Sequence, residues 1–316
     1  MAKSSIVLVK ELRKRLRNAV AKNPMEGILF SGGLDTSILA VLNPHSKAIT
    51  VTFQSSGQDI RYARIVVNHL RLEHYHRTVE IEEALGAIPQ VIKTLKSFDP
   101  AIPNDIVVYF GLKSAQEMGW KGIMTGDGAD ELLAGYSYMA ELDDLEGYIK
   151  RIEPFLFFSS NKLAKFFDLR LSQPYLDERF RKFALKIPKE FKIKEEKGSL
   201  RRGKWILRKA FEGFLPGEVI WQDKRPLEYG SGMTGLRAII ESRISDKEFE
   251  EKKRRYPVKF ITKDHLYYYE IYLKEVGDIP KPGEGQKSCT GCGAGIGVSS
   301  FHCKVCGNLQ GESLDE

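Results

Sequence analysis

Two short stretches combine glycines with hydroxyl and carboxylate side chains, and the first is Ser31–Ser37. It reads Ser-Gly-Gly-Leu-Asp-Thr-Ser and lies between the apolar runs Ile28–Phe30 and Ile38–Leu42. This order predicts a buried strand, a sharp glycine turn and a helix. Such a turn aims unpaired backbone N–H groups and the positive end of a helix dipole at one point, where phosphate binds. Asp35 would repel a phosphate unless Mg²⁺ lay between them. The alternative is an ordinary Gly-Gly turn before a helix.

The second stretch is Thr125–Tyr136, which reads Thr-Gly-Asp-Gly-Ala-Asp-Glu-Leu-Leu-Ala-Gly-Tyr and follows an apolar run. Its glycines allow the backbone to approach a ligand closely. The carboxylates of Asp127, Asp130 and Glu131 would repel one another unless a cation intervened or they occupied a helix N-terminus. The alternative is an acidic, N-capped surface helix. Because the stretch accompanies the first loop, we interpret it as functional.

The elements around these stretches alternate between short apolar runs and amphipathic segments. The predicted strands are Gly27–Phe30, Ala48–Phe53, Tyr75–Val79 and Gly122–Thr125. The predicted helices are Val7–Lys22, Ile60–Leu70, Ala84–Leu95 and Ile106–Met118, with a rigid loop at Phe98–Asp105. This alternation predicts an α/β fold with a doubly wound parallel sheet. In such a sheet the ligand crevice lies beyond the carboxyl ends of the strands, where the first loop is expected.

Composition limits the class of protein. The chain has 316 residues, and its 49 Lys+Arg against 42 Asp+Glu give a net charge of +7. We expect one large α/β domain over residues 1–276. No apolar run reaches the length of a membrane span, the polar N-terminus is unlike a signal peptide, and no cysteine precedes Cys289. We therefore expect a cytoplasmic protein with no disulfide framework and no membrane partner.

The C-terminal region carries a second kind of site. Residues 277–287 are rich in Pro and Gly and are predicted to form a linker, followed by a zinc ribbon over 288–308 and a polar tail over 309–316. Two Cys-x-x-Cys-Gly knuckles predict Zn²⁺ ligands, Cys289, Cys292, Cys303 and Cys306. Two disulfides or an iron–sulfur cluster are the alternatives, and His302 is the alternative ligand. A closed site of four cysteines is structural, and its acidic surroundings favour contact with a protein partner.

The two stretches together resemble a known family. The first resembles the PP-loop of ATP pyrophosphatases, which cleave ATP between the α and β phosphates. With the second it is similar to the synthetase domain of asparagine synthetases and their β-lactam synthetase relatives. Gln173–Phe180 is similar to that family's Pro-Phe-Leu-Asp segment, and Lys204–Phe211, Leu215-Pro216 and Trp221–Lys224 to its C-terminal helix and lysine loop. Argininosuccinate synthetases share only the first string. The resemblance implies an adenine-nucleotide α-hydrolase-like fold.

The resemblance also implies roles for individual residues. Asp127 and Lys224 match the catalytic carboxylate and the lysine that neutralises the phosphates as the adenylate forms or breaks. Glu131 and Asp177 match positions that hold the amino-acid substrate, and Asp35 and Asp130 match the Mg²⁺ ligands. The residues expected to bind ATP are Leu29, Ser31, Gly32, Gly33, Asp35, Thr36, Ser37, Ser55, Thr125 and Gly126.

The chain departs from the family pattern in the features that handle the acceptor and ammonia. Ser172 stands where relatives carry an arginine, and Phe98–Asp105 contains no arginine although relatives have one there. Such an arginine could grip a carboxylate in a bidentate manner, so its loss leaves the acceptor open between aspartate and another carboxylate. The relatives begin with a glutaminase domain whose nucleophile is an N-terminal cysteine. We expect no such domain here, and therefore free ammonia or ammonia delivered by a separate amidotransferase.

Three functions follow from these observations. The first is an amide synthetase that adenylates a carboxylate with ATP, releases pyrophosphate and uses ammonia. The second is a tRNA-modifying PP-loop enzyme that adenylates a base oxygen, and the third is a non-catalytic ATP-binding regulator. The later family motifs favour the first. The ribbon and the segment Arg181–Lys209, with 12 Lys+Arg against 3 Glu, favour the second. A solvated loop at Lys194–Gly203 is, however, the preferred explanation of this charge. RNA is thus the less favoured partner.

Overall fold

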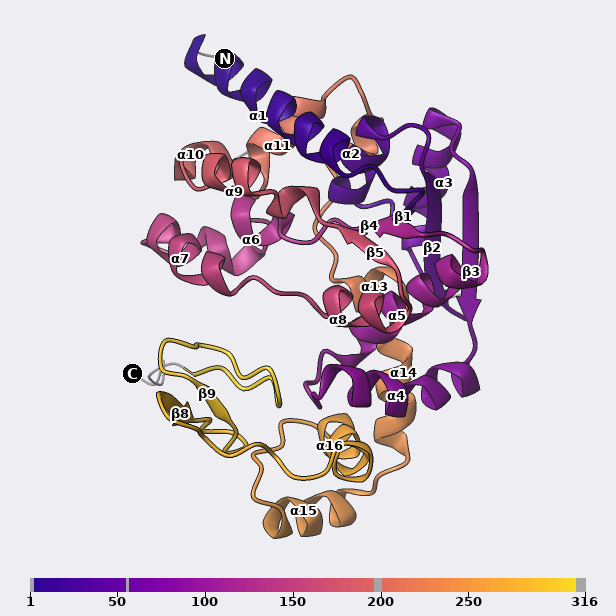
Figure 1. Cartoon of the computed structure of the whole chain (residues 1–316), viewed down its shortest axis with the longest axis vertical. Helices are drawn as coiled ribbons and strands as arrows, with labels where there is room; N and C mark the ends of the chain where they lie inside the picture. Colours follow the sequence, from indigo (N-terminus) through magenta and orange to yellow (C-terminus); the bar gives the residue numbers. More distant parts are fainter. Residues whose placement is uncertain (1–2, 55–56, 196–200, 311–316) are drawn as a thin grey trace.

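A five-stranded parallel sheet forms the centre of the molecule (Figure 1). The computed structural model describes residues 3–54, 57–195 and 201–310. Each strand runs parallel to its neighbours in the order β3-β2-β1-β4-β5. The strands are β1 Gly27–Leu29, β2 Lys47–Phe53, β3 His74–Val79, β4 Gly122–Met124 and β5 Arg170–Ser172. The predicted α/β class with a parallel sheet is confirmed.

The strand order places the two chemical stretches at one point. The chain passes from β1 to β2 and β3 on one side, and then crosses back to pair β4 with the other edge of β1. The carboxyl ends of β1 and β4 therefore flank the topological switch, where open α/β sheets bind their ligands. Ser31–Ser37 follows β1 and Thr125–Tyr136 follows β4. Strand β5 was not predicted, because its three residues include the exposed Arg170 and carry little apolar pattern.

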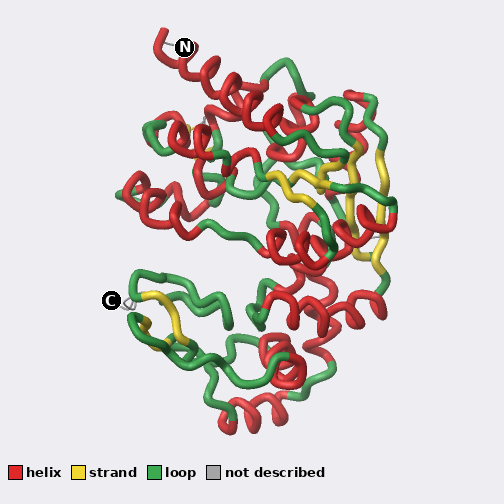
Figure 2. Tube along the Cα trace, viewed as in Figure 1, coloured by secondary structure: helices red, strands yellow, loops and turns green. Residues whose placement is uncertain are grey.

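Helices cover both faces of the sheet and bury two cores (Figure 2). The core on one face joins Ile28 of β1 to α1, α2 and α11, and the core on the other joins Val51 of β2 to α4, α5 and α16. In chain order the helices up to β5 are α1 Lys3–Lys22, α2 Leu34–Leu42, α3 Asp59–Leu70, α4 Ile81–Leu95, α5 Ile102–Glu117, α6 Ala129–Leu133, α7 Leu145–Ile152 and α8 Ser159–Phe166. After β5 they are α9 Glu178–Ala184, α10 Lys189–Lys192, α11 Trp205–Phe211, α12 Gly217–Ile220, α13 Leu227–Gly230, α14 Thr234–Ser242, α15 Asp246–Arg255 and α16 Lys263–Glu275.

Helix α5 begins earlier than the sequence predicted. Residues 102–105 were expected to continue the loop that starts at Phe98, but they form the first turn of α5. Proline is well tolerated in a first helical turn because the N–H that it lacks would have no intrahelical partner there. Pro103 occupies such a position, and the Ile102 N–H donates to the Asp99 carbonyl at 3.0 Å. As a result, Asn104 and Asp105 are held on a helix and not on a loop.

The C-terminal segment packs against α16 and not away from the domain (Figure 1). Strands β8 Gln286–Ser288 and β9 Gly295–Gly297 form an antiparallel pair, and the two cysteine knuckles flank β9. Gln286 and Lys287, which the sequence assigned to the linker, belong to β8. The short strands β6 Lys194–Glu195 and β7 Arg201–Arg202 pair within the basic segment, whose residues 196–200 lie outside the described part.

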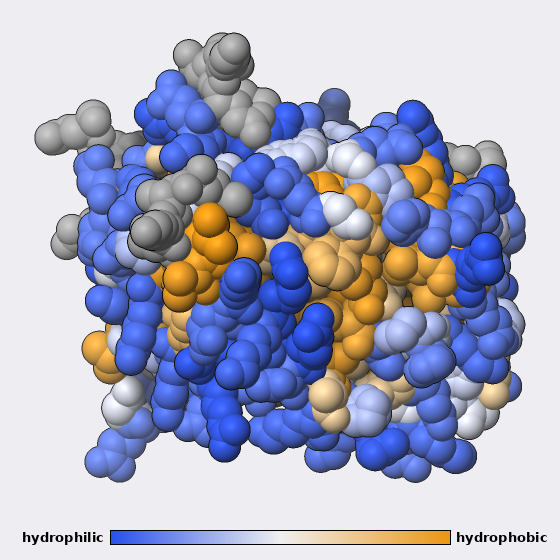
Figure 3. All heavy atoms as spheres, turned by 90° about the horizontal axis from the view of Figure 1, so that it is seen from above, coloured by the Kyte–Doolittle hydropathy of each residue, from blue (hydrophilic) through white to orange (hydrophobic). Residues whose placement is uncertain are grey.

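Figure 3 shows the end of the molecule where α1 lies, with apolar atoms visible between a largely hydrophilic cover. Two of the exposed apolar residues, Ile6 and Val7, belong to the first turns of α1. Among the described residues, none of the helices combines the length and the apolar character needed to cross a bilayer.

Candidate active site

The loop after β1 closes tightly around its own polar groups. Gly32 has a φ of 68°, and a Cβ there would lie 2.2 Å from the backbone nitrogen of Ala63, so only glycine fits without displacing α3. The Ser31 hydroxyl accepts from the Gly33 N–H at 3.1 Å and lies 3.3 Å from the Thr36 hydroxyl. The loop therefore presents hydroxyl and N–H groups at the start of α2, which is the arrangement that binds a phosphate.

The loop after β4 lies directly against the loop after β1. A Cβ at Gly126 would be only 3.1 Å from the Cβ of Asp35. Helix α6 then starts at Ala129 and carries Asp130 and Glu131 in its first turn. The close approach of the two loops brings Asp35 and Asp130 to one place, although they are 95 residues apart in the chain.

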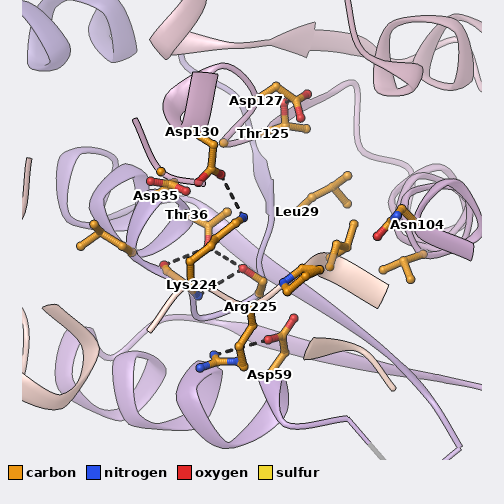
Figure 4. A pocket seen from close by; sticks show the side chains of 18 of the residues that line it. Leu29, Asp35, Thr36, Asp59, Asn104, Thr125, Asp127, Asp130, Lys224 and Arg225 are labelled. Carbon is orange, nitrogen blue, oxygen red and sulfur yellow. Dashed lines mark hydrogen bonds and ion pairs between the residues drawn. The ribbon is translucent and has the colours of Figure 1, made fainter. Parts of the chain in front are cut away.

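Two lysines, Lys204 and Lys224, join these carboxylates, and Figure 4 shows Lys224 next to Asp130. The Nζ of Lys204 lies 2.6 Å from Oδ2 of Asp35 and 2.6 Å from Oδ1 of Asp130. The Nζ of Lys224 donates to Oδ2 of Asp130 at 2.9 Å and lies 5.5 Å from the ring centroid of Tyr136. The other oxygen of Asp35 is buried and has no hydrogen-bond partner among the described residues. A buried carboxylate oxygen without a donor, beside a second carboxylate, suits a hard cation such as Mg²⁺.

Burial and charge shape the ionisation of this cluster. Burial raises the pKa of Asp35, and the ammonium of Lys204 only partly opposes the shift. Although burial alone would lower the pKa of Lys204, the carboxylates of Asp130 and Asp35 raise it above its ordinary value. Burial also works against the ionisation of Asp130, but Lys204 and Lys224 outweigh it and lower the pKa of that carboxyl. The cluster therefore holds a fixed positive charge between two acids.

The cluster opens into a cavity of about 590 Å³. Most residues that the sequence assigned to the site line it: Leu29, Ser31, Gly33, Asp35, Thr36, Thr125, Gly126, Asp127, Asp130, Glu131 and Lys224. Gly32 and Ser37 are not among the residues that line the cavity. The Gly32 carbonyl accepts from Gln222, and the Ser37 N–H donates to the Gly33 carbonyl. Ser55 lies outside the described residues.

The structure does not bring Asp177 to the cavity. One of its oxygens accepts from the Arg179 and Phe180 N–H groups at 3.0 and 3.3 Å, and the other lies 3.1 Å from the Lys22 Nζ. Asp177 therefore caps α9, a position that aspartate favours because its carboxylate satisfies the free N–H groups of the first turn. The role in substrate binding that the resemblance implied does not fit this position. The segment reaches the site through Tyr175 instead, whose hydroxyl donates to the Asp35 carbonyl at 3.0 Å.

Asp127 and Glu131 are both held by defined donors. Oδ2 of Asp127 accepts from Thr125 and Ser160 at 2.6 Å each and from Gln173 at 2.8 Å. Glu131 accepts from the Tyr136 hydroxyl at 2.7 Å, and burial raises the pKa of its carboxyl. These contacts fix both carboxylates in the wall of the cavity.

Several lining residues were not predicted from the sequence. Lys204 is the first residue of the segment that resembles the family's C-terminal helix. Because many lysines and arginines surround it in the sequence, its contact with Asp35 was not predicted. Asp59, at the start of α3, lies 3.6 Å from the Arg225 guanidinium, and burial raises the pKa of its carboxyl to about 7. Asn104 and Asp105 line the cavity because α5 begins early. The sequence signal for Asn104 and Asp105 is two adjacent polar residues in the first turn of a largely apolar helix.

Asp105 completes an acidic side of the cavity opposite to the lysines. It accepts a hydrogen bond from Ser159, and burial raises the pKa of its carboxyl to about 7. The next residue in α8, Ser160, donates to Asp127. We refer to Asn104, Asp105, Asp127, Ser159 and Ser160 as the acidic side, and to Ser31, Asp35, Thr36, Asp130, Lys204 and Lys224 as the lysine side. Figure 4 shows Asn104 and Asp35 at opposite ends of the view.

The four cysteines form a separate buried cluster near the C-terminus. Their sulfur atoms all lie within 4.8 Å of one another, with Cys289 and Cys306 at 3.7 Å and Cys292 and Cys303 at 3.9 Å. Four thiolates around Zn²⁺ at about 2.3 Å would be roughly 3.8 Å apart at the corners of a tetrahedron. The Gly291 N–H and the Gln310 amide both donate to the Cys289 sulfur. The arrangement is compatible with one metal ion, and the four cysteines are free and not joined in disulfides.

The fold and the site together define the class of protein: an α/β chain with a phosphate-type loop and a paired-carboxylate cluster at the switch point of a parallel sheet. The sequence matches the profile of the asparagine synthase family over residues 11–153 and 145–266. The chain therefore belongs to the asparagine synthase family.

Individual relatives agree with this assignment. The chain is 28% identical over 313 residues to a probable glutamine-hydrolyzing asparagine synthetase of Dictyostelium discoideum, covering 87% of this chain and 56% of that protein. It is 26% identical over 330 residues to the glutamine-hydrolyzing asparagine synthetase B of Escherichia coli (strain K12), covering 94% of this chain and 58% of that protein. The chain thus spans just over half the length of these two curated relatives.

Solved structures give weaker likenesses. A U34-tRNA thiolase of Methanococcus maripaludis aligns with a TM-score of 0.37 and 16% identity, covering 86% of this chain and 84% of the thiolase. An NH3-dependent NAD synthetase of Campylobacter jejuni aligns with a TM-score of 0.34 and 13% identity, covering 89% and 99% of the two chains. Both TM-scores are low, and the family assignment rests on the sequence.

Proposed function

We propose that the chain is an ATP-dependent amide synthetase that adenylates a carboxylate and then transfers the acyl group to ammonia. The observation that carries this proposal is the cluster in which Lys204 joins Asp35 and Asp130 at the meeting point of the two glycine loops. Membership of the asparagine synthase family supports the same activity. A carboxylate pair next to a phosphate-type loop suits Mg·ATP better than any uncharged ligand.

The lysine side would hold the triphosphate. Ser31, Gly33 and Thr36 of the loop line the cavity. Asp35 and Asp130 are the residues that would hold Mg²⁺. When bound, the ion would neutralise charge on the phosphate oxygens. The ammonium groups of Lys204 and Lys224 supply further positive charge at fixed positions, which costs no reorganisation when negative charge develops. Leu29 and Gly126 would line the nucleoside pocket.

The proposed reaction has two steps. An oxygen of the acceptor carboxylate bonds to the α phosphorus while the bond to the β phosphate breaks, so pyrophosphate leaves with that electron pair. The ammonia nitrogen then attacks the acyl carbon, AMP leaves, and the nitrogen gives up a proton. Lys224 would stabilise the charge on the phosphates during the first step, since its ammonium reaches the cluster from a separate loop. Asp127 is the proposed carboxylate near the reacting centre.

The chemistry of the acidic side supports an acceptor that carries an amine. The cationic residues that line the described cavity are Lys204, Arg208, Lys224 and Arg225, and each bonds to an acid or to backbone carbonyl groups. The carboxylates of Asp105 and Asp127 lie in the opposite wall, where the ammonium group of an amino acid would be favourable. We therefore propose an amino-acid carboxylate as acceptor, with aspartate as the first candidate to test.

The basic segment does not favour RNA as the acceptor. Several of its described charges form local ion pairs: Arg181 with Glu153 at 2.6 Å, Lys182 with Glu178 at 2.5 Å, Arg201 with Glu141 at 3.2 Å and Arg202 with Asp223 at 3.0 Å. Lys204 points into the cavity and Arg208 binds backbone carbonyl groups. A phosphate backbone would have to compete with these partners, which weakens the electrostatic argument for RNA.

A pyrophosphate-release screen tests the proposed function. The full chain is supplied with ATP, Mg²⁺, ammonia and each amino acid in turn, with bulk tRNA as a separate arm. Release that depends on one amino acid, together with AMP and an amide product, supports the synthetase. Release only with tRNA would favour the base-modifying enzyme, and tight ATP binding without release in any arm would favour a regulator.

We also propose that the four cysteines bind one Zn²⁺. Their sulfur separations match a tetrahedral site, and thiolates this close leave no room for a cluster of several iron atoms. Elemental analysis of the purified chain should find about one zinc per chain, the number that a single tetrahedral site holds. Iron in place of zinc, or titratable thiols with no metal, would contradict the assignment.

A further inference from the structure

The cysteine knuckles are bonded to the segment that leads into α5. The Phe98 N–H donates to the Val305 carbonyl at 2.7 Å, and the Ser97 hydroxyl donates to the same carbonyl at 3.3 Å. Val305 lies between the two ligands of the second knuckle. Oδ2 of Asp99 lies 3.2 Å from Nε2 of His302. The knuckle thus contacts three consecutive residues, Ser97 to Asp99, through both backbone and side chains.

Aromatic packing reinforces this junction. The Phe98 side chain is fully buried and its ring centroid lies 5.5, 5.0 and 5.1 Å from the rings of His265, Tyr269 and Tyr272 of α16. The four cysteines belong to the same buried core as these rings. A second backbone bond, from the Lys259 N–H to the Gly291 carbonyl at 2.8 Å, ties the first knuckle to the segment before α16. A metal ion at the four cysteines would therefore hold in place the surface against which Ser97–Asp99 packs.

The same segment continues into the wall of the active-site cavity. Oδ1 of Asp99 accepts from the Ala101 N–H at 2.8 Å, and the Asp99 carbonyl accepts from the first N–H of α5. Two residues further on, Asn104 and Asp105 line the cavity. Asn104 also accepts from the Glu228 N–H at 2.8 Å, at the start of α13, four residues after Lys224.

Arg237 links the two ends of this path. Its guanidinium donates to the Pro100 carbonyl at 2.9 Å and lies 3.1 Å from the Glu228 carboxylate. Its other nitrogen contacts Asp264 in the first turn of α16 at 2.5 Å. The path from the knuckle to the lysine loop therefore runs through Asp99, α5 and α13. Arg237 braces it through Pro100 just before α5 and Glu228 of α13.

We propose that the metal-loaded ribbon is a positioning device for the active site: it fixes residues 97–105 and, through Asn104, the loop that carries Lys224. Asp99, His302 and Arg237 are positioning residues in this path. The proposal goes beyond the proposed function because it concerns the shape of the cavity and holds for any acceptor. It also gives the structural cysteine site a role inside this chain, separate from the contact with a protein partner that the sequence predicts.

The test is regional hydrogen exchange on the full chain with and without metal. Zinc is removed with a chelator, its loss is verified by elemental analysis, and exchange is measured in peptides covering residues 97–105, 226–230 and 28–38. We expect exchange to accelerate at least about tenfold in the first two regions, because their bonds depend on the knuckle, and to change by less than about twofold in the third. Zinc added back should restore protection.

Point variants keep the proposal testable if the metal-free chain aggregates. His302→Leu removes the contact with Asp99 and leaves all four cysteines, whereas His302→Gln keeps a donor there, and Leu309→Ala is a matched control on the exposed surface of the ribbon. We expect faster exchange at 97–105 in His302→Leu, rescue in His302→Gln and no change in Leu309→Ala, all with full zinc content.

Two results would overturn the proposal. Unchanged exchange at 97–105 and 226–230 after complete zinc loss would show that the ribbon does not support the cavity. Equal acceleration in all three regions would reduce the ribbon to a contributor to global stability. Neither result depends on catalysis, so both are distinct from failure of the synthetase assignment, which the pyrophosphate screen reports.

Discussion

The two sides of the cavity are built in different ways. The lysine side is assembled at the ends of β1 and β4, where loops with close-packed glycines fix Asp35 and Asp130 next to each other. The acidic side comes from the first turns of α5 and α8 and from Asp127, joined by hydroxyl–carboxylate bonds. The ends of two strands therefore position the carboxylates of the lysine side. The acidic side is positioned by the first turns of two helices that are far apart in the sequence.

The acidic side is the part of the site that is more open to substitution. A phosphate site needs backbone N–H groups and paired charges at fixed separations, so its residues can hardly vary. The acidic side needs only to match the acceptor, and this chain lacks the arginines that the family resemblance implied at Ser172 and within Phe98–Asp105. Under the proposed function, the lysine side would activate the carboxylate and the acidic side would select the acceptor.

The largest expected effect belongs to the lysine side. Asp35→Asn or Asp130→Asn should weaken Mg·ATP binding by more than about a hundredfold, because each removes a carboxylate from the proposed metal site and leaves buried Lys204 with one acidic partner. Calorimetric titration with ATP and Mg²⁺ measures it, with circular dichroism to verify the fold. Asp143→Asn, on an exposed position, is the matched control. Unchanged affinity in both variants would remove the metal from this cluster.

The next effect separates chemistry from binding. Lys224 reaches Asp130 from a loop of its own, and its side chain is about one third exposed, so its loss should not collapse the cluster. Lys224→Ala should keep ATP affinity within about tenfold and lower pyrophosphate release by at least about a hundredfold. Paired titration and turnover measurements decide this, with exposed Lys281→Ala as control. Equal turnover in variant and wild type would place Lys224 outside the reaction.

The sequence predicts the two loops of the lysine side better than it predicts Lys204 or the acidic side. Ser31–Ser37 and Thr125–Tyr136 are continuous strings, so local pattern and glycine chemistry were enough to predict two loops at one sheet edge. Lys204 could not be placed, because its approach to Asp35 depends on how α11 packs 169 residues later in the chain. Asp105 was hidden for another reason. The start of α5 was misjudged by four residues, and its partner Ser159 lies on a different helix.

A smaller effect is expected on the acidic side. Asp105→Asn keeps the shape of the residue but removes its charge, so an acceptor that carries an amine should bind less well. We expect the KM for the acceptor that supports pyrophosphate release to rise about tenfold, with ATP affinity unchanged. Glu117→Gln, an exposed acid at the other end of α5, is the matched control. A lower KM would mean that this wall repels the acceptor and that the acceptor is more acidic than proposed.

The same variant has a defined pH dependence. Burial raises the pKa of Asp105 from 3.8 to about 7, so the folded chain holds a proton that the unfolded chain releases between these values. The contribution of Asp105 to the wild-type free energy of unfolding therefore decreases as the pH rises from about 4 to about 7. Above about pH 7 this destabilising contribution stays constant. Asp105→Asn should melt at a higher temperature than wild type at pH 8 and show no such gain at pH 4. Parallel melting curves measure it.

The smallest effect concerns Asp177, which the family resemblance and the structure place differently. As a cap of α9 it should contribute about 1 kcal/mol to stability, and the exposed ion pair with Lys22 should add little. Asp177→Ala is therefore expected to lower the melting temperature by a few degrees and to leave the acceptor KM unchanged. Asp177→Ser keeps a capping oxygen without the charge, so it should recover most of the lost stability. Denaturation and acceptor titration on the three proteins separate the two roles. A large rise in acceptor KM in both variants, with normal melting, would return Asp177 to the substrate site and would mean that α9 moves toward the cavity when the acceptor binds.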